Sequence, residues 1–354
     1  MKKKKKSGKS KAKRILLSVI IIVVLSLVVV GYDFYKKVYD PNISTWVGKE
    51  KYIYIPTGTD FSRLMQLLNE EEVLRNSASF EWVAERMGYK NHVKPGRYLI
   101  RRNMNNKQLV TLLRSGEQSP VKVVIEHIRT PAQLAGAVGR QLEADSVSIN
   151  KLLKDPDFMR SYGFTPETAL AFFIPNTYEF YWNTSATGFF KRMAAEYKAF
   201  WTPARQEKAK QAELSQTEVT ILASIVEQET RRNDEKPIIA GVYINRYRKG
   251  WKLEADPTLV YAAGDFAINR VLNVHKEIDS PYNTYMYAGL PPGPICLPAI
   301  SSVEAVLNYR KHNYMFFCAR EDFSGYHNFA TTYNEHLANA RKFQKELNRR
   351  NIRS

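Results

Sequence analysis

The sequence predicts an α+β protein with a single N-terminal transmembrane helix, a small α/β subdomain and then a larger mixed α+β domain. Three observations support this prediction. Residues 15–32, "ILLSVIIIVVLSLVVVGY", carry no charge. Residues 51–116 have the pattern of strand, helix, helix, strand and short helix, and helical and strand patterns alternate beyond them. The 354 residues, 44% of them hydrophobic, suffice for two domains that each have a core.

The uncharged run predicts a helix that spans a membrane. As an α-helix it would extend about 27 Å, close to the thickness of the hydrocarbon layer. The alternative is a cleaved signal peptide, but these have shorter apolar cores and a small-x-small cleavage site, whereas this run continues into "VVVGYDFYKK". Residues 1–14 hold nine basic residues and no acidic one. By the positive-inside rule, this tail stays in the cytoplasm and the rest of the chain faces outward.

The net charge of +18 is weak evidence for a nucleic-acid partner because the basic tail accounts for half of it. Beyond the tail, 44 basic residues face 35 acidic ones. The tail suits anionic lipid, and the rest of the chain lacks the motifs of nucleic-acid-binding modules. We therefore expect a membrane partner and no nucleic acid. The two cysteines, Cys296 and Cys318, either pair or remain free thiols.

The composition divides the chain into five parts: a basic tail (1–14), a transmembrane helix (15–34), a linker (35–50), the small subdomain (51–120) and the larger domain (121–354). In the subdomain, the β-branched and aromatic residues of Lys51–Ile55 predict a strand. Thr59 or Asp60 can cap the helix that follows, and a second helix fits Ser79–Met87.

The larger domain is predicted to contain two strands and several helices. The strands are Val121–Ile128 and the segment "YMFFCA". In "LSQTE", Ser215 and Glu218 form a capping box that begins a further helix. Periodicity and capping residues predict the other helices over Pro131–Glu143, Ile149–Tyr162, Lys191–Phe200, Pro203–Gln211, Pro237–Lys249 and Tyr333–Arg349.

The capped helix ends in "ILASIVEQET", where an apolar run suddenly contains two carboxylates. Val219, Leu222, Val226 and Glu229 are spaced three, four and three residues apart, so they share one stripe, whereas Glu227 lies about 200° away. A carboxyl group against an apolar wall is costly to ionise, so its pKa rises, which suits a general acid. The alternative is that the glutamates are solvated, as glutamates usually are. We expect this of Glu227, and for Glu229 both interpretations stand.

Two neighbouring segments carry polar groups that could join Glu229. In "INR", Asn245 and Arg246 lie at the edge of an apolar helical stripe. They either line a cleft with Glu229 or belong to a surface helix. In "LEADPTLVY", Asp256 is either a second functional carboxylate or the cap of a helix that begins at Pro257.

The segment "SPYNTYMYAGLPPGPI" predicts a stiff loop that could hold a sugar. Tyr282, Asn283 and Tyr285 offer flat rings and hydrogen-bonding groups, although a packed turn with buried tyrosines fits equally well. His327 and His336 lie nine residues apart, and no third ligand follows at a zinc-site spacing. We therefore expect neither a metal nor a cofactor.

The motifs together resemble those of the YceG-like endolytic murein transglycosylases (MltG-type). They are "LASIVEQET", "INR", "LEADPTLVY", "SPYNTY", "GLPPGPI" and "HNFATTYNEH", in that order. The resemblance covers essentially the whole chain. It implies a single-pass protein of the bacterial inner membrane, with a cytoplasmic N-terminus and a periplasmic catalytic domain. It also implies that residues 51–120 are LysM-like, that glycan strands of peptidoglycan are the substrate, and that peptidoglycan synthases are candidate partners.

The resemblance also implies a reaction. The family's catalytic glutamate precedes a threonine in "E-x-E-T", which corresponds to Glu229. Protonated Glu229 would donate to the glycosidic oxygen between N-acetylmuramic acid and N-acetylglucosamine, and its carboxylate would then take a proton from the muramic C6 hydroxyl. A 1,6-anhydro end would result and strand elongation would stop. The candidate substrate-binding or positioning residues are Asn245, Arg246, Asp256, Tyr282, Asn283, Tyr285 and His327.

Two rival functions make different predictions. A two-carboxylate glycoside hydrolase would use Glu229 as the acid and Asp256 as the partner, and would leave a reducing end. A non-catalytic scaffold that binds peptidoglycan would tolerate Glu229→Gln. The chain also departs from the family in "ALAFFIPNTY", where Leu170 and Asn176 replace carboxylates that are frequent in the family. The resemblance therefore does not extend to any function of those two carboxylates.

Overall fold

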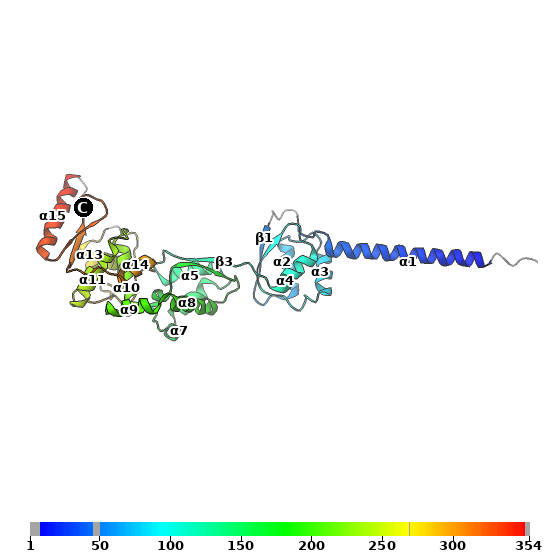
Figure 1. Cartoon of the computed structure of the whole chain (residues 1–354), viewed down its shortest axis with the longest axis horizontal. Coiled ribbons are helices and arrows are strands. Elements are labelled where there is room, and N and C mark those ends of the chain that lie inside the picture. The colour runs from blue at the N-terminus through cyan, green and yellow to red at the C-terminus, as the bar shows by residue number, and fades with distance from the viewer. Residues whose placement is uncertain (1–7, 45–49, 269, 351–354) are drawn as a thin grey trace, which may run out of the picture. The chain divides into compact units, whose positions relative to one another are not determined.

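The computed structural model describes residues 8–44, 50–268 and 270–350 (Figure 1). The chain folds into two compact units. Unit 1 contains the chain up to Val121 together with residues 181–183, and unit 2 contains residues 122–180 and 184–354. The mixed α+β class predicted from the sequence is confirmed: within the described residues, unit 1 combines helices with one two-stranded sheet, and unit 2 combines helices with two such sheets.

Helix α1 (Gly8–Tyr39) contains the uncharged run and is long and apolar enough to cross a membrane. It continues five residues past the predicted end at residue 34, so the first part of the predicted linker (35–50) is helical. The reason is that no helix breaker occurs before Pro41. In addition, Lys36 and Lys37 lie in the last turn, where positive charge favours the helix dipole.

Unit 1 has the predicted order of elements. Strand β1 (Glu50–Ile55) pairs antiparallel with β2 (Gly96–Arg101), with Tyr52 opposite Leu99. Asp60 caps the first helix, since its side chain accepts from the backbone N–H of Arg63. The helices are α2 (Phe61–Glu70), α3 (Ser77–Arg86) and α4 (Asn106–Ser115). Their apolar faces enclose a core that includes Ile53, Leu64, Leu68, Phe80, Tyr98, Leu109 and Leu113.

Buried asparagines fix the last turn of α1 to unit 1. The Asn106 side-chain amide donates to the carbonyl of Lys37 at 2.8 Å and to the hydroxyl of Ser79 at 2.9 Å. Its carbonyl accepts from the Asn42 amide at 2.7 Å. Because Asn106 is only 1% exposed, these bonds satisfy polar atoms that would otherwise be buried without partners.

Unit 2 contains most of the helices. Strand β3 (Val121–Ile125) pairs with β4 (Asn176–Phe180), and β5 (Phe316–Ala319) pairs antiparallel with β6 (His327–Ala330). The helices are α5 (Pro131–Gly139), α6 (Ser146–Lys154), α7 (Pro156–Ser161), α8 (Ala186–Phe200), α9 (Pro203–Gln211), α10 (Gln216–Glu229), α11 (Lys236–Arg248), α12 (Asp256–Ala263), α13 (Asn273–Lys276), α14 (Ile300–Leu307) and α15 (Tyr333–Arg349). In chain order, helices α5 to α7 and a short 3₁₀ segment at Ala169–Phe172 lie between β3 and β4, helices α8 to α14 lie between β4 and β5, and α15 follows β6.

One segment that was predicted to be a single helix forms two helices in the structure. The segment Ile149–Tyr162 was expected to be continuous, but it breaks between α6 and α7 at Asp155. The residue before a proline avoids the α conformation, and Asp155 precedes Pro156. The Asp155 side chain then caps the second helix by accepting from the backbone N–H groups of Asp157 and Phe158.

Helix α10 lies at the centre of the unit 2 core. The predicted capping box is confirmed: Ser215 accepts from the N–H of Glu218, whose carboxylate accepts from the N–H of Ser215. Residues 219–226 are all buried, and α10 packs against α11, α12 and α14. The core therefore surrounds this helix and fixes the position of its C-terminal residue, Glu229.

Candidate active site

Glu229 ends α10 and is held by a tyrosine. The hydroxyl of Tyr243, on α11, donates to Glu229 Oε1 at 2.5 Å. Burial raises the pKa of Glu229 to about 7; the Tyr243 bond acts against this rise, the negative charge of Asp256 adds to it, and the Arg246 charge opposes it. The raised pKa expected from the apolar stripe is therefore present. Glu229 can hold its proton near neutral pH, and its catalytic role remains a prediction.

Glu229 lines two clefts. Cleft A has a volume of about 500 Å³ and is lined by Arg129, Gln228, Glu229, Asp256, Pro257, Val260, Tyr261, Phe266, Ile268, Arg270, Val271 and Ile295. Cleft B has a volume of about 540 Å³ and is lined by Glu229, Thr230, Arg231, Arg232, Ala319, Gly325, Tyr326 and His327. Among the described lining residues, Glu229 is common to both. A ligand that occupied both clefts would therefore pass the carboxyl group.

Asp256 faces cleft A and pairs with Tyr285. The Tyr285 hydroxyl donates to Asp256 Oδ1 at 2.6 Å, and burial together with this carboxylate raises the pKa of Tyr285. The alternative that Asp256 caps its helix is wrong, because α12 begins at Asp256 itself and Ala255 occupies the cap position. Asp256 therefore lines cleft A together with Glu229, and Tyr285 contacts the Asp256 carboxylate; their functional roles stay predictions.

The side chains of Asn245 and Arg246 donate to backbone carbonyls of residues that line neither cleft. The Asn245 amide donates to the carbonyls of His312 (2.8 Å) and Tyr314 (3.0 Å), and Asn245 lines neither cleft. The sugar contact of Asn245 stays a prediction. Arg246, which is 7% exposed, donates to backbone carbonyls of Met315 (2.7 Å) and Leu253 (2.8 Å). Its charge acts on Glu229 from behind the wall.

The tyrosine-rich loop is a packed turn at Asn283. This residue is fully buried, and its amide donates to the carbonyls of Lys276 (3.0 Å) and Ile278 (2.8 Å). Its side-chain oxygen accepts from the N–H of Tyr285 at 2.9 Å. The turn itself therefore uses both ends of the Asn283 amide, and the sugar contact of Asn283 stays a prediction.

Tyr282 supports the wall of cleft A from behind. Its ring lies 4.6 Å from that of Tyr261, centroid to centroid, and Tyr261 lines the cleft. Burial raises the pKa of Tyr282, consistent with its packing against the core of unit 2. Tyr282 is therefore placed to hold Tyr261 in position.

His327 lines cleft B and is oriented by a buried carboxylate. Its backbone N–H donates to Glu235 Oε1 at 2.8 Å, and its Nδ1 lies 2.9 Å from Glu235 Oε2. Glu235 is 3% exposed. Because a carboxylate only accepts, it favours the tautomer with the proton on Nδ1 and leaves Nε2 as the acceptor nitrogen.

Glu227 was expected to be solvated, but its side chain is only 27% exposed. Its carboxylate forms an ion pair with Lys236 at 3.0 Å, and the Lys236 side chain is 5% exposed. The hydroxyl of Ser302, on α14, also donates to it. The helical period correctly placed Glu227 away from Glu229, but the period could not show that α14 covers that side.

Three residues of the site were not predicted from the sequence. Tyr243 holds Glu229, and Arg129 donates to the Gln228 side chain at 3.1 Å in cleft A. Arg129 and Gln228 are 99 positions apart, so no local pattern links them. Tyr243 has a weak signal, as a hydroxyl-bearing residue within a largely apolar helix. Within the described ranges, no group of three or more His, Cys, Asp or Glu residues could hold a metal ion.

The fold and the site define a class of protein. It is an α+β protein in which a helix is long enough to span a membrane and a carboxyl group of near-neutral pKa lines two clefts. This arrangement suits acid catalysis on an extended substrate. The chain belongs to the YceG-like family, whose model matches residues 53–342. The family predicted from the sequence motifs is thereby confirmed.

Relatives of known name are similar over most of the chain. The endolytic murein transglycosylase of Bacillus subtilis (strain 168) is 30% identical over 312 residues, which cover 84% of this chain and 85% of that protein. The protein of the same name from Streptococcus pneumoniae serotype 2 is 26% identical, over 82% of this chain and 58% of its own length. A crystal structure of a YceG-like protein from Listeria monocytogenes matches with a TM-score of 0.55 and 28% identity, over 82% of this chain and 98% of that one.

Proposed function

We propose that this protein is a membrane-anchored endolytic lytic transglycosylase of peptidoglycan. It cleaves the β-1,4 bond between N-acetylmuramic acid and N-acetylglucosamine within a strand and leaves a 1,6-anhydro end. The observation that carries the proposal is Glu229, a carboxyl group with a pKa of about 7 at the residue common to two clefts. The names of the relatives support the choice of murein as substrate.

In the first half of the reaction, Glu229 is the proton donor. Its protonated carboxyl gives the proton to the glycosidic oxygen as the bond from that oxygen to C1 of the muramic residue breaks. Positive charge develops on C1 and the ring oxygen. The Asp256 carboxylate accepts a hydrogen bond from Tyr285 and lies in cleft A. Its negative charge stabilises the positive charge that develops on C1 and the ring oxygen.

In the second half, the Glu229 carboxylate is the base. It accepts the proton of the muramic C6 hydroxyl while that oxygen bonds to C1, so no water is consumed and the acid is regenerated. The Tyr243 hydroxyl donates to the carboxylate and stabilises its charge between the two proton transfers. One carboxyl group therefore suffices, and Asp256 need not act as a nucleophile.

Two clefts, one on each side of the cut, suit a strand that continues in both directions. In cleft B, His327 offers Nε2 to a sugar hydroxyl, with Arg231 and Arg232 beside it. Asp256, Tyr285 and His327 are thus the proposed contacts with substrate. Arg246, Asn245, Asn283 and Tyr282 act through the walls that they hold in place.

The membrane topology and domain division complete the proposal. Helix α1 is the anchor in the inner (plasma) membrane, residues 1–14 remain in the cytoplasm, and the rest is extracytoplasmic. Residues 51–120 form a LysM-like subdomain, and residues 121–354 form the catalytic domain. Cleavage of nascent strands near the membrane would end their elongation, so peptidoglycan synthases are the expected partners.

The test is the chemistry of the new ends. The full chain in detergent micelles and its Glu229→Gln variant are incubated with purified, uncrosslinked glycan strands, and the products are weighed by mass spectrometry. The proposal predicts anhydro-muramic ends on fragments of intermediate length from the parent chain and none from the variant. Reducing ends, heavier by one water, would instead identify a hydrolase and implicate Asp256. Strands that both chains bind but neither cuts would identify a scaffold.

A further inference from the structure

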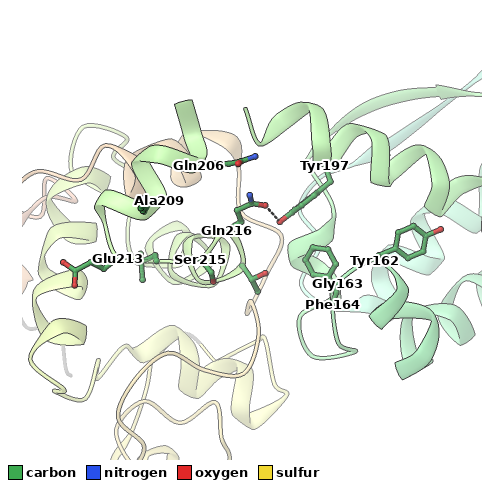
Figure 2. A pocket seen from close by; sticks show the side chains of 12 residues that line it. Tyr162, Gly163, Phe164, Tyr197, Gln206, Ala209, Glu213, Ser215 and Gln216 are labelled. Atoms are coloured by element: carbon green, nitrogen blue, oxygen red, sulfur yellow. Dashed lines mark hydrogen bonds between the residues drawn. The ribbon is translucent and has the colours of Figure 1, made fainter. Parts of the chain in front are cut away.

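A third cavity, cavity C, lies at the opposite end of α10 from Glu229. It has a volume of about 720 Å³ and is lined by Tyr162, Gly163, Phe164, Tyr197, Gln206, Ala209, Lys210, Glu213, Leu214, Ser215, Gln216 and Thr217 (Figure 2). The fourteen residues of α10 span about 20 Å, so cavity C is well separated from the cleaved bond. Its described lining residues include none that line clefts A or B.

One wall of cavity C is aromatic and rigid. Tyr162 is the C-cap of α7, Phe164 lies two residues further on, and Tyr197 lies on α8. The rings of Phe164 and Tyr197 meet edge to face at 5.2 Å between centroids, and the Tyr162 ring lies 5.2 Å from Phe172 in the core. The core thus holds these rings in place before any ligand binds. Flat rings of this kind suit the apolar face of a sugar.

The opposite wall carries two glutamines whose orientations are fixed. The Gln206 amide nitrogen, on α9, donates to the carbonyl of Trp201 at 2.7 Å, so its Oε1 remains as an acceptor. Gln216 Oε1, on α10, accepts from the hydroxyl of Tyr197 at 2.9 Å, so its amide nitrogen remains as a donor (Figure 2). Cavity C therefore presents one acceptor and one donor near an aromatic wall.

We propose that cavity C is a second saccharide site, which binds an N-acetylated sugar of a glycan strand away from the cut. An acetamido group has one N–H and one C=O, which match the acceptor of Gln206 and the donor of Gln216. Apart from tyrosines, the ionisable side chains among the described lining residues are Lys210 and Glu213. Glu213 is the carboxylate among these residues, and it is not buried as Glu229 is. This fits a site that binds a strand without cleaving it.

The naming of a glycan as the ligand rests on the proposed function, so binding is measured in a chain that cannot cut. The parent for this test is the full chain with Glu229→Gln, in detergent micelles. The probe is uncrosslinked glycan strands from which an amidase has removed the peptide stems. Stem-free strands separate recognition of sugar from recognition of peptide.

The sharpest variant is Gln216→Glu, which keeps an acceptor for Tyr197 and removes the donor toward the cavity. A negative charge in the first turn of α10 also favours the helix, so folding should persist. Gln206→Ala removes the acceptor, and Gln211→Ala, at the end of the same helix α9 but outside cavity C, is the matched control. We expect each cavity variant to bind strands about fivefold more weakly, the loss of one hydrogen bond, and the control to match the parent.

A second measurement uses the chain with Glu229 intact. Gln216→Glu should lower kcat/KM for long strands about fivefold and leave kcat/KM for a tetrasaccharide unchanged, because a short substrate fills only the clefts at Glu229. Cavity variants that bind stem-free strands within twofold of the parent would overturn the proposal, and so would strand binding that requires the peptide stems. Neither result depends on whether cleavage is lytic, so the binding test can fail while the proposed function stands.

Discussion

Replacing Tyr243 with phenylalanine should raise the pKa of Glu229 further. Phenylalanine keeps the ring, which packs at 5.9 Å against Phe317, and removes only the hydroxyl that donates to Oε1 at 2.5 Å. That bond stabilises the carboxylate more than the protonated acid, so it holds the pKa down against the effect of burial. Without it, the proton should be held over a wider range of pH.

The size of the shift follows from the strength of the bond. A hydrogen bond to a charged group contributes about 1.5–3 kcal/mol, and one pKa unit corresponds to about 1.4 kcal/mol. The pKa of Glu229, about 7 in the parent, should therefore rise by about one to two units. Asp256→Asn should act in the opposite direction, because the negative charge of Asp256 raises the pKa of Glu229.

The assay is the pH dependence of kcat/KM for cleavage of glycan strands. An acid catalyst is active while protonated, so the alkaline limb of the profile reports its pKa in the free enzyme. The account predicts that this limb moves to higher pH in Tyr243→Phe and to lower pH in Asp256→Asn. A limb that stays in place in both variants, or moves in the reverse order, would refute the assignment of Glu229 as the acid.

Three further predictions concern stability. The pKa of Glu229 is raised in the folded state, so the contribution of Glu229 to the free energy of unfolding is fully present below its unfolded pKa of 4.5 and is lost as pH rises through about 7. Glu229→Gln should therefore increase the free energy of unfolding at pH 8 by up to about 3 kcal/mol and leave it unchanged at pH 4, as measured by urea denaturation. Glu227→Leu leaves the buried ammonium of Lys236 without its ion pair and should cost about 3–5 kcal/mol in the same assay; a loss below 1 kcal/mol would contradict the pairing. Asn283→Ala should lower the melting temperature and cost about 1–3 kcal/mol, while KM at a temperature where the chain stays folded is unchanged; a raised KM with normal stability would support a sugar contact of Asn283.

The spacing of apolar residues within one helix was enough to predict that Glu229 lies on the apolar face of that helix. The spacing of Val219, Leu222, Val226 and Glu229 is a property of one helix, and the capping box at Ser215 fixed where that helix begins. The aromatic and β-branched residues of Lys51–Ile55 likewise predict a strand from nearby residues alone. Such features depend on few long-range contacts, so they can be deduced before the fold is known.

The partners of Glu229 depend on tertiary packing and could not be deduced in this way. Tyr243 reaches the carboxyl group only because α11 packs on α10. The identity of Asn283 also left its function open, because a side-chain amide can hydrogen-bond a sugar or stabilise a turn equally well. Only the contacts with Lys276 and Ile278 decide for the turn.

The most direct test of the central claim is the pKa of the Glu229 carboxyl group itself. The full chain, labelled with ¹³C at glutamate side-chain carboxyls, is titrated by NMR in detergent micelles, and the resonance missing from Glu229→Gln identifies the group. If Glu229 is the acid, we expect a midpoint near pH 7. A midpoint at the ordinary glutamate value of 4.5 would mean that Glu229 is ionised at neutral pH, and the proposed acid catalysis would fail.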